Sequence, residues 1–245
     1  MSPKLGILGG MGPLATVDFL HKLVDRTPAK ADHEHIPFVV HSVPQLPDRM
    51  QAIFDGGASP LPKLMEAIET LQAAGAVCIA MPCNTAHYWY DQFAPAAKVP
   101  FLHIADAALA ALAAHQQPLA RLGLLGTRGT LRAGFYQKRF AERGVECIIS
   151  SPGDQEKLVD PAIKAIKAND LGRATPLIER AAEHLLEQGT SSVVLGCTEI
   201  PVVLNQFRPA LAVRCVDVTV ALADACIGWW QRHYATAGQA HASTT

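Results

Sequence analysis

Residues 76–87 read AVCIAMPCNTAH and residues 191–201 read SSVVLGCTEIP, so one local pattern occurs twice in the chain. In each stretch an apolar run leads to a cysteine, Cys83 or Cys197, and a polar step that contains threonine follows. Short apolar runs of this kind are typical of buried parallel strands. Ligands of such sheets bind just beyond the carboxyl ends of the strands, where both cysteines stand. The pattern therefore predicts two reactive thiols used as a pair.

The sequence around the two cysteines repeats as well. KLGILGG at residues 4–10 returns as RLGLLGT at residues 121–127, and the spacing from each glycine strand to its cysteine is nearly preserved. VPFLHIADAAL and LAVRCVDVTVAL form a third matching pair, with Asp106 and Asp217 in corresponding places. The chain therefore contains two copies of one α/β unit.

Apolar strands alternate with helical patterns in both copies, which indicates parallel sheets with right-handed crossovers. In the second copy we expect a single helix around residues 131–143. The predicted fold is α/β, with two pseudo-symmetric lobes, each a mainly parallel sheet flanked by helices, and the active site in the cleft between them. We expect residues 1–104 with 216–245 to form the N-terminal lobe and residues 105–215 the C-terminal lobe.

Composition narrows the class of protein. The chain has 245 residues, of which 49% are hydrophobic and 18% charged, as in a soluble globular protein. A formal net charge of -1 without a Lys/Arg cluster argues against nucleic acid or an anionic membrane as a partner. No apolar span of membrane length occurs, and Asp18 with the preceding glycine turn argues against a secretion signal. We expect a cytoplasmic protein whose partner is a small molecule.

Six cysteines without a CxxC pair do not form a disulfide framework or a zinc motif, so we expect reduced thiols. Four of them lie in predicted strands or in the final helix and are interpreted as packing residues; these are Cys78, Cys147, Cys215 and Cys226. The segment His33–His35 is interpreted as a solvated loop, and no metal site is predicted. No cofactor is predicted either, because the glycines of GILGGMG are out of register for a dinucleotide fingerprint and no acidic residue ends the second strand.

Opposed thiols across a lobe interface suit one kind of chemistry. One sulfur removes a proton from a carbon acid while the other delivers a proton to the opposite face of the same carbon. This inverts the configuration of that carbon without a cofactor. Contacts of about 3–3.5 Å on each side would hold the sulfurs well beyond disulfide distance. We expect helix N-termini behind Cys83 and Cys197 to lower the pKa of the thiols. His87, four residues after Cys83, either tunes that thiol or packs.

The segments GILGGMGP, PDR, PCNTAH, LLGTRGT and GCTEIP resemble the aspartate/glutamate racemase family, and the resemblance extends to about Ile227. It implies a cofactor-independent amino-acid racemase, commonly a homodimer, with Cys83 and Cys197 as opposed acid and base. Glutamate racemases usually open with an Asp-Ser glycine motif and have His after the second Cys-Thr. This chain has Gly-Gly-Met at 9–11 and Glu199 at those places, so it resembles the aspartate racemase branch.

The resemblance also implies a set of substrate-binding residues. Asn84, Thr85 and Thr198 would bind the α-carboxylate or the amino group, and Thr127 would lie at the edge of the site. Arg49 and Lys164 match basic positions that face the side-chain carboxylate, and Met11 belongs to the glycine turn beside the substrate. A buried, unpaired basic residue would be costly in a site for an apolar side chain, so the expected substrate is a small dicarboxylic amino acid, aspartate first.

Other functions fit parts of the same pattern. A maleate isomerase or a hydantoin racemase of the same superfamily would use a similar fold. A non-catalytic, two-lobed ligand-binding or redox-sensing protein would instead form a reversible disulfide between Cys83 and Cys197.

Overall fold

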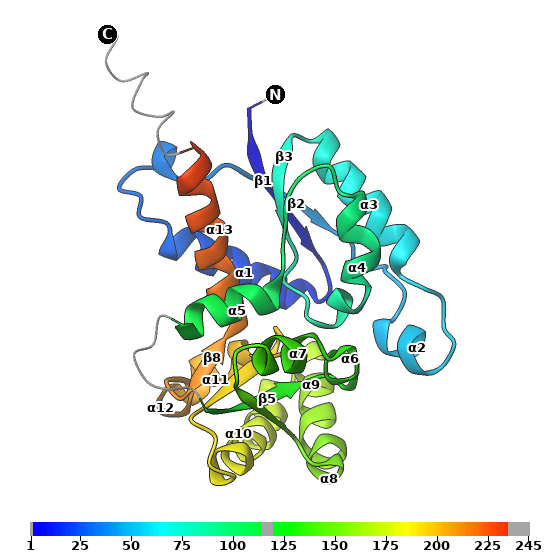
Figure 1. Ribbon diagram of the computed structural model, residues 1–245, viewed down its shortest axis with the longest axis vertical. Coiled ribbons are helices and arrows are strands. Elements are labelled where there is room, and N and C mark those ends of the chain that lie inside the picture. Colours follow the sequence, from blue (N-terminus) through cyan, green and yellow to red (C-terminus); the bar gives the residue numbers. More distant parts are fainter. Residues whose placement is uncertain (1, 114–119, 235–245) are drawn as a thin grey trace.

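The computed structural model describes residues 2–113 and 120–234, which form two four-stranded parallel sheets (Figure 1). Their strand orders are β2-β1-β3-β4 and β6-β5-β7-β8, so the second sheet repeats the first strand by strand. The predicted α/β fold with two similar lobes is confirmed.

The first unit alternates strands and helices from the N-terminus. Its strands are β1 (Lys4–Gly9), β2 (Phe38–Ser42), β3 (Ala76–Ala80) and β4 (Phe101–Leu102). Its helices are α1 (Pro13–Arg26), α2 (Arg49–Phe54), α3 (Leu61–Ala73) and α4 (Tyr90–Phe93), with 3₁₀ turns at Asp32–Glu34, Thr85–Trp89 and Ala94–Ala96.

The second unit follows the same plan. Its strands are β5 (Arg121–Gly126), β6 (Glu146–Ile149), β7 (Ser192–Gly196) and β8 (Cys215–Asp217). Its helices are α6 (Arg128–Ala133), α7 (Phe135–Ala141), α8 (Pro152–Asp154), α9 (Asp160–Lys167), α10 (Leu171–Glu187), α11 (Ile200–Phe207) and α12 (Pro209–Ala212). The single helix expected around residues 131–143 is two helices, because Gly134 between them has a left-handed backbone with φ of 69°.

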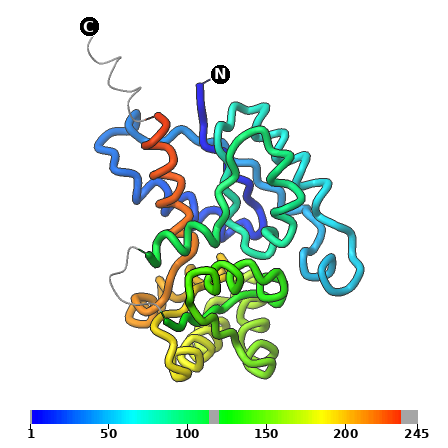
Figure 2. Tube along the Cα trace, in the orientation of Figure 1, coloured from blue at the N-terminus to red at the C-terminus, as the bar shows by residue number. Residues whose placement is uncertain are grey.

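Two further helices connect the lobes. Helix α5 (Ile104–Ala113) follows the first sheet and packs on α13 (Val218–Tyr234), which follows the second sheet and returns to contact α1 (Figures 1 and 2). The largest buried apolar cluster contains side chains from both sheets and from these helices. The lobe boundaries at residues 104 and 216 remain a prediction, and residues 235–245 of that prediction lie outside the described residues.

A buried ion pair joins the end of the second sheet to the first lobe. The Lys22 ammonium, on α1, donates to the Asp217 carboxylate at 2.7 Å and to the Thr219 hydroxyl at 2.7 Å. Burial alone would raise the pKa of Asp217, but Lys22 and the hydrogen bonds from Thr219 hold it below its usual value. The polar contact therefore fixes the point at which the chain leaves β8 and crosses back to α1.

Parallel strands place all carboxyl ends at one edge of a sheet. The glycine turn after β1, the cysteine after β3, the threonine after β5 and the cysteine after β7 all stand at those edges. Gly10 has φ of +92°, and a Cβ there would lie 2.5 Å from the backbone nitrogen of Val43, so only glycine fits this turn. Within residues 2–113 and 120–234, no helix is long and apolar enough to cross a membrane.

Candidate active site

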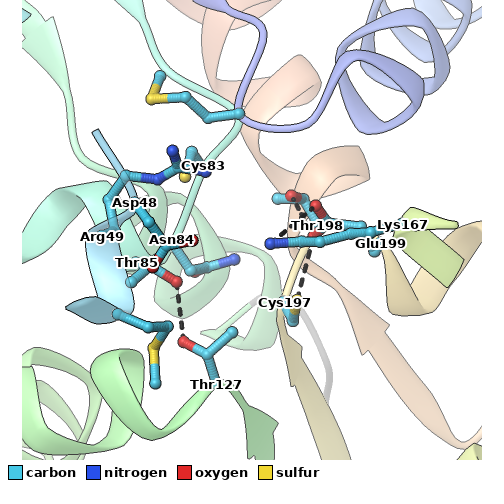
Figure 3. A pocket seen from close by; sticks show the side chains of 12 residues that line it. Asp48, Arg49, Cys83, Asn84, Thr85, Thr127, Lys167, Cys197, Thr198 and Glu199 are labelled. Atoms are coloured by element: carbon cyan, nitrogen blue, oxygen red, sulfur yellow. Dashed lines mark hydrogen bonds and ion pairs between the residues drawn. The ribbon is translucent and has the colours of Figure 1, made fainter. Parts of the chain in front are cut away.

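The carboxyl ends of both sheets meet at one cavity. Its empty volume, including the open mouth, is about 350 Å³. Its lining comes from both lobes (Figure 3): Met11, Asp48, Arg49, Met50, Cys83, Asn84, Thr85, Thr127, Lys167, Cys197, Thr198 and Glu199. Cys83, Arg49 and Asn84 lie on one side of the cavity, and Cys197, Glu199 and Lys167 lie on the other.

The loop after β3 presents Cys83 as a free thiol that is only 4% exposed. The backbone N–H of Ile104 donates to Nε2 of His87 at 3.3 Å, so the proton of this ring is on Nδ1. That Nδ1 lies 2.8 Å from the carbonyl oxygen of Cys83 and donates to it. His87 therefore packs beneath the loop and fixes its backbone.

The turn after β7 presents Cys197, which is also a free thiol and 4% exposed. Its Sγ donates to Oε2 of Glu199 at 3.1 Å. The Glu199 carboxylate also accepts from the backbone N–H of Gly12 at 3.2 Å and from the Thr198 hydroxyl at 3.3 Å. Since Gly12 belongs to the first lobe, this carboxylate connects the two lobes beside the thiol.

Both thiols have pKa values above that of an ordinary cysteine. Burial is the main cause for each, because it disfavours the thiolate. The Glu199 charge adds to the rise in the pKa of both thiols, and a cation partly offsets each rise: Arg49 at Cys83 and Lys167 at Cys197. The lowering expected from helix N-termini is therefore outweighed by desolvation.

Asn84 offers an unpaired donor to the cavity. The Tyr136 hydroxyl donates to Oδ1 of Asn84 at 2.7 Å, which fixes the orientation of the amide. Its Nδ2 is buried and has no hydrogen-bond partner in the described part of the chain. A buried N–H donor without a partner is costly, so this group is suited to a carboxylate oxygen.

Two threonines close the cavity between the lobes. The hydroxyls of Thr85 and Thr127 lie 2.8 Å apart, and Thr127 also caps α6 by accepting from the backbone N–H of Thr130 at 3.1 Å. A Cβ on Gly129 would lie 2.8 Å from Cγ2 of Thr85, so glycine is needed for this close approach.

Two cations face the cavity. Arg49 is the first residue of α2, whose N-cap Asp48 accepts from the backbone N–H of Gln51 at 2.9 Å. Lys167 is the last residue of α9, with its ammonium 3.9 Å from Oε1 of Glu199. Burial alone would lower the pKa of Lys167, but the charge of Glu199 and the nearby thiols raise it. Lys167 therefore stays protonated.

The cavity contains eight of the nine residues predicted for the site, namely Met11, Arg49, Cys83, Asn84, Thr85, Thr127, Cys197 and Thr198. The exception is Lys164, which is exposed and lines a separate surface groove with Arg128 and Asp160. Lys167, one helical turn further, occupies the cavity instead. The segment AIKAIK contains both lysines, and this repetition was the available signal for Lys167.

Comparison with known proteins places these features in context. The model of the Asp/Glu/Hydantoin racemase family matches residues 8–226. An aspartate racemase of Picrophilus torridus is 32% identical, with 92% of this chain and 93% of that chain covered and a TM-score of 0.81. The broad-specificity amino-acid racemase RacX of Bacillus subtilis is 27% identical over 91% of this chain and 96% of its own length. A glutamate racemase of Pseudomonas paraeruginosa is 28% identical over 91% of this chain and 77% of its own length.

We predict that His87 makes the folded state sensitive to acid. Burial lowers the pKa of His87 to about 4, below the usual 6.5. The unfolded chain therefore binds more protons between these values, and stability is lost as the pH falls through this window. At pH 5 the loss due to this residue is about 2 kcal/mol.

Urea denaturation at pH 7.5 and pH 5 measures this effect. The His87→Gln variant should lose about 2 kcal/mol less than the parent chain between the two pH values. His33→Gln, at an exposed position, is the matched control and should keep the parental loss. An unchanged loss in His87→Gln would show that His87 is not the acid-sensitive group.

Proposed function

Because the chain belongs to the Asp/Glu/hydantoin racemase family, we propose that it racemises a small dicarboxylic amino acid, aspartate first, without a cofactor and with two cysteines as acid and base. One observation carries this proposal. Two buried, unlinked thiols from corresponding positions of two repeated units line a single cavity, together with two cations and an unpaired amide donor.

The proposed reaction is a two-base proton transfer at Cα. The thiolate of one cysteine takes the Cα proton, so the Cα–H bond breaks and an S–H bond forms. The electron pair remains on the substrate, delocalised into the α-carboxylate. The other cysteine delivers its proton to the opposite face of Cα, and its S–H electron pair stays on sulfur. The enzyme ends with its two thiols in exchanged protonation states and is ready for the mirror-image substrate.

The polar groups of the cavity support an acidic substrate. Nδ2 of Asn84 needs an acceptor, and we assign it to the α-carboxylate together with the hydroxyls of Thr85 and Thr198. Arg49 and Lys167 remain for the side-chain carboxylate. A second negative charge on the substrate would pair with these cations, whereas an apolar side chain would partly desolvate them and give them no new acceptor.

The length of the substrate is the finer part of the proposal. Aspartate is favoured by the similarity to the Picrophilus aspartate racemase and by Glu199, which stands where glutamate racemases usually have histidine. The similarities to RacX and to a glutamate racemase make glutamate and neutral amino acids the proper comparison substrates. The homodimer and the cytoplasmic location remain predictions from the family resemblance.

Racemisation in D2O tests the proposed function directly. With L-aspartate and no added pyridoxal phosphate, we expect D-aspartate by chiral chromatography and one deuterium at Cα by mass spectrometry. The panel should include glutamate, alanine, maleate and a 5-substituted hydantoin. Cys83→Ser and Cys197→Ser should each lower turnover by at least about 100-fold, because proton transfer at one face is lost. Absence of exchange and inversion with every amino acid would contradict the proposal, and a reversible Cys83–Cys197 disulfide in that case would favour a redox sensor.

A matched pair of lysine variants tests the substrate class. Lys167→Met removes a charge that lines the cavity at its open side, and it should lower kcat/KM for aspartate by about tenfold, as expected for loss of a charged hydrogen bond to the substrate. Lys164→Met removes an exposed charge three residues away on the same helix, and kcat/KM should stay within about twofold. Equal losses in the two variants would remove Lys167 from the substrate-binding site.

A further inference from the structure

The two thiols of the cavity have different neighbours, although the lobes repeat. Two residues after Cys83 stands Thr85, a neutral residue whose hydroxyl is hydrogen-bonded to the Thr127 hydroxyl. Two residues after Cys197 stands Glu199, a carboxylate that is 4% exposed. The repeat therefore has a carboxylate that contacts the thiol in one unit and, at the corresponding sequence position of the other unit, a neutral hydroxyl that contacts Thr127 instead.

Glu199 is surrounded by hydrogen-bond donors. The backbone N–H of Gly12 and the hydroxyl of Thr198 donate to it, and the Lys167 ammonium lies 3.9 Å away. These neighbours direct two donors and one positive charge at the carboxylate, so its oxygens act as hydrogen-bond acceptors. The 3.1 Å contact between Sγ of Cys197 and Oε2 of Glu199 then requires a proton on one of the two atoms, because two adjacent anions would repel each other.

The proton of that contact belongs on the sulfur. A carboxylic acid is ordinarily more acidic than a thiol by about four pKa units. The direction of the contact agrees with this order, since the oxygens of Glu199 also accept from the backbone N–H of Gly12 and from the Thr198 hydroxyl. Cys197 is therefore a thiol that donates to a carboxylate.

Cys83 lies in a different electrostatic environment. The charged groups that face it are Arg49 on α2 and, across the cavity, Glu199 and Lys167. Within residues 2–113 and 120–234, no carboxylate accepts a hydrogen bond from its sulfur. Asp48 lines the same cavity but caps the backbone of α2. If one of the two thiols is ionised in the free enzyme, the charged neighbours described above favour ionisation of Cys83 over that of Cys197.

From this asymmetry we propose that Glu199 is a positioning residue that holds the proton on Cys197, so that the free enzyme waits with Cys197 as the acid and Cys83 as the base. This assignment rests on the proposed racemase function for its catalytic meaning, but the protonation states belong to the free enzyme. It goes beyond the two-cysteine reaction, which treats the thiols as equivalent.

The assignment gives the two half-reactions different starting points. A substrate whose Cα–H faces Cys83 meets an enzyme in the right protonation state. The Cα–H bond breaks toward Cys83, the S–H bond of Cys197 breaks, and a new Cα–H bond forms on the opposite face. Cys197 is then a thiolate beside the Glu199 carboxylate, which makes it the stronger base of the pair. The mirror-image substrate returns its proton to Cys197 and restores the resting form.

Cysteine alkylation in the free enzyme tests the assignment, because iodoacetamide reacts with thiolates rather than thiols. Peptide mass spectrometry should follow each cysteine separately between about pH 6 and pH 10. We expect Cys83 to be alkylated at least about tenfold faster than Cys197 at pH 8, which corresponds to about one pKa unit between them. Faster alkylation of Cys197 in the parent chain would overturn the assignment.

The Glu199→Gln variant removes the charge and keeps the size of the side chain. We expect the apparent pKa of Cys197 to fall by at least about one unit and its alkylation at pH 8 to rise about tenfold, with Cys83 changed by less than about threefold. The matched control is Asp48→Asn, which removes a carboxylate from the same cavity and keeps a good helix N-cap. Alkylation of Cys197 should remain slow in this control. In Glu199→Asp, which keeps a carboxylate, its alkylation rate should lie between those of the parent chain and Glu199→Gln.

A Cys197 rate that is the same in Glu199→Gln as in the parent chain would overturn the proposal. If iodoacetamide does not enter the cavity, the pH profile of kcat gives the second readout. The part of the kcat profile that reports the titration of Cys197 should move by at least about one pH unit toward lower pH in Glu199→Gln and stay in place in Asp48→Asn. An unmoved profile in Glu199→Gln would also overturn the proposal. Loss of racemase activity with every substrate would contradict the proposed function, whereas the alkylation order would still decide the role of Glu199.

Discussion

The carboxyl ends of two parallel sheets meet at one cavity, and the positions of the candidate site residues depend on this constraint. A parallel sheet gathers the ends of its strands at one edge, so a repeated unit supplies the same kinds of residue at two corresponding edges. The contacts between Thr85 and Thr127 and between Gly12 and Glu199 then join the two edges directly. The buried pair of Lys22 and Asp217 and the return of α13 to α1 connect the lobes outside the site. Repetition alone would provide two thiols, and these inter-lobe contacts place them in one cavity.

Burial sets the chemistry of that cavity. Desolvation raises the pKa of both thiols, which makes each thiolate rare but strongly basic when it forms. The cations Arg49 and Lys167 oppose this effect, whereas the Glu199 charge reinforces it at both thiols and accepts a hydrogen bond from Cys197. A bound dicarboxylate would add negative charge near both cations. The site therefore combines buried thiols with cations that would attract an anionic substrate, and the proposed removal of a weakly acidic Cα proton needs this combination.

Much of this arrangement could be predicted from the sequence, because the relevant residues follow strands that are short, apolar and repeated. The lobes, the paired cysteines and the placement of Arg49, Asn84 and the threonines in one cavity follow from that pattern. Lys167 could not be separated from Lys164 in this way, because the two lysines stand three residues apart on neighbouring positions of α9 and only the packing of that helix decides which one reaches the cavity. The orientation of the Asn84 amide depends on Tyr136, a contact between distant parts of the chain that no local pattern shows.

The central claim is that one substrate carbon lies between the sulfurs of Cys83 and Cys197. A crystal structure of the double variant Cys83→Ser and Cys197→Ser with bound aspartate tests it most directly. The account predicts Cα between the two serine hydroxyls, each within about 3–4 Å, as near-attack geometry requires, with the side-chain carboxylate at Arg49 and Lys167. Aspartate bound outside this cavity, or with Cα against only one of the two serines, would contradict the account.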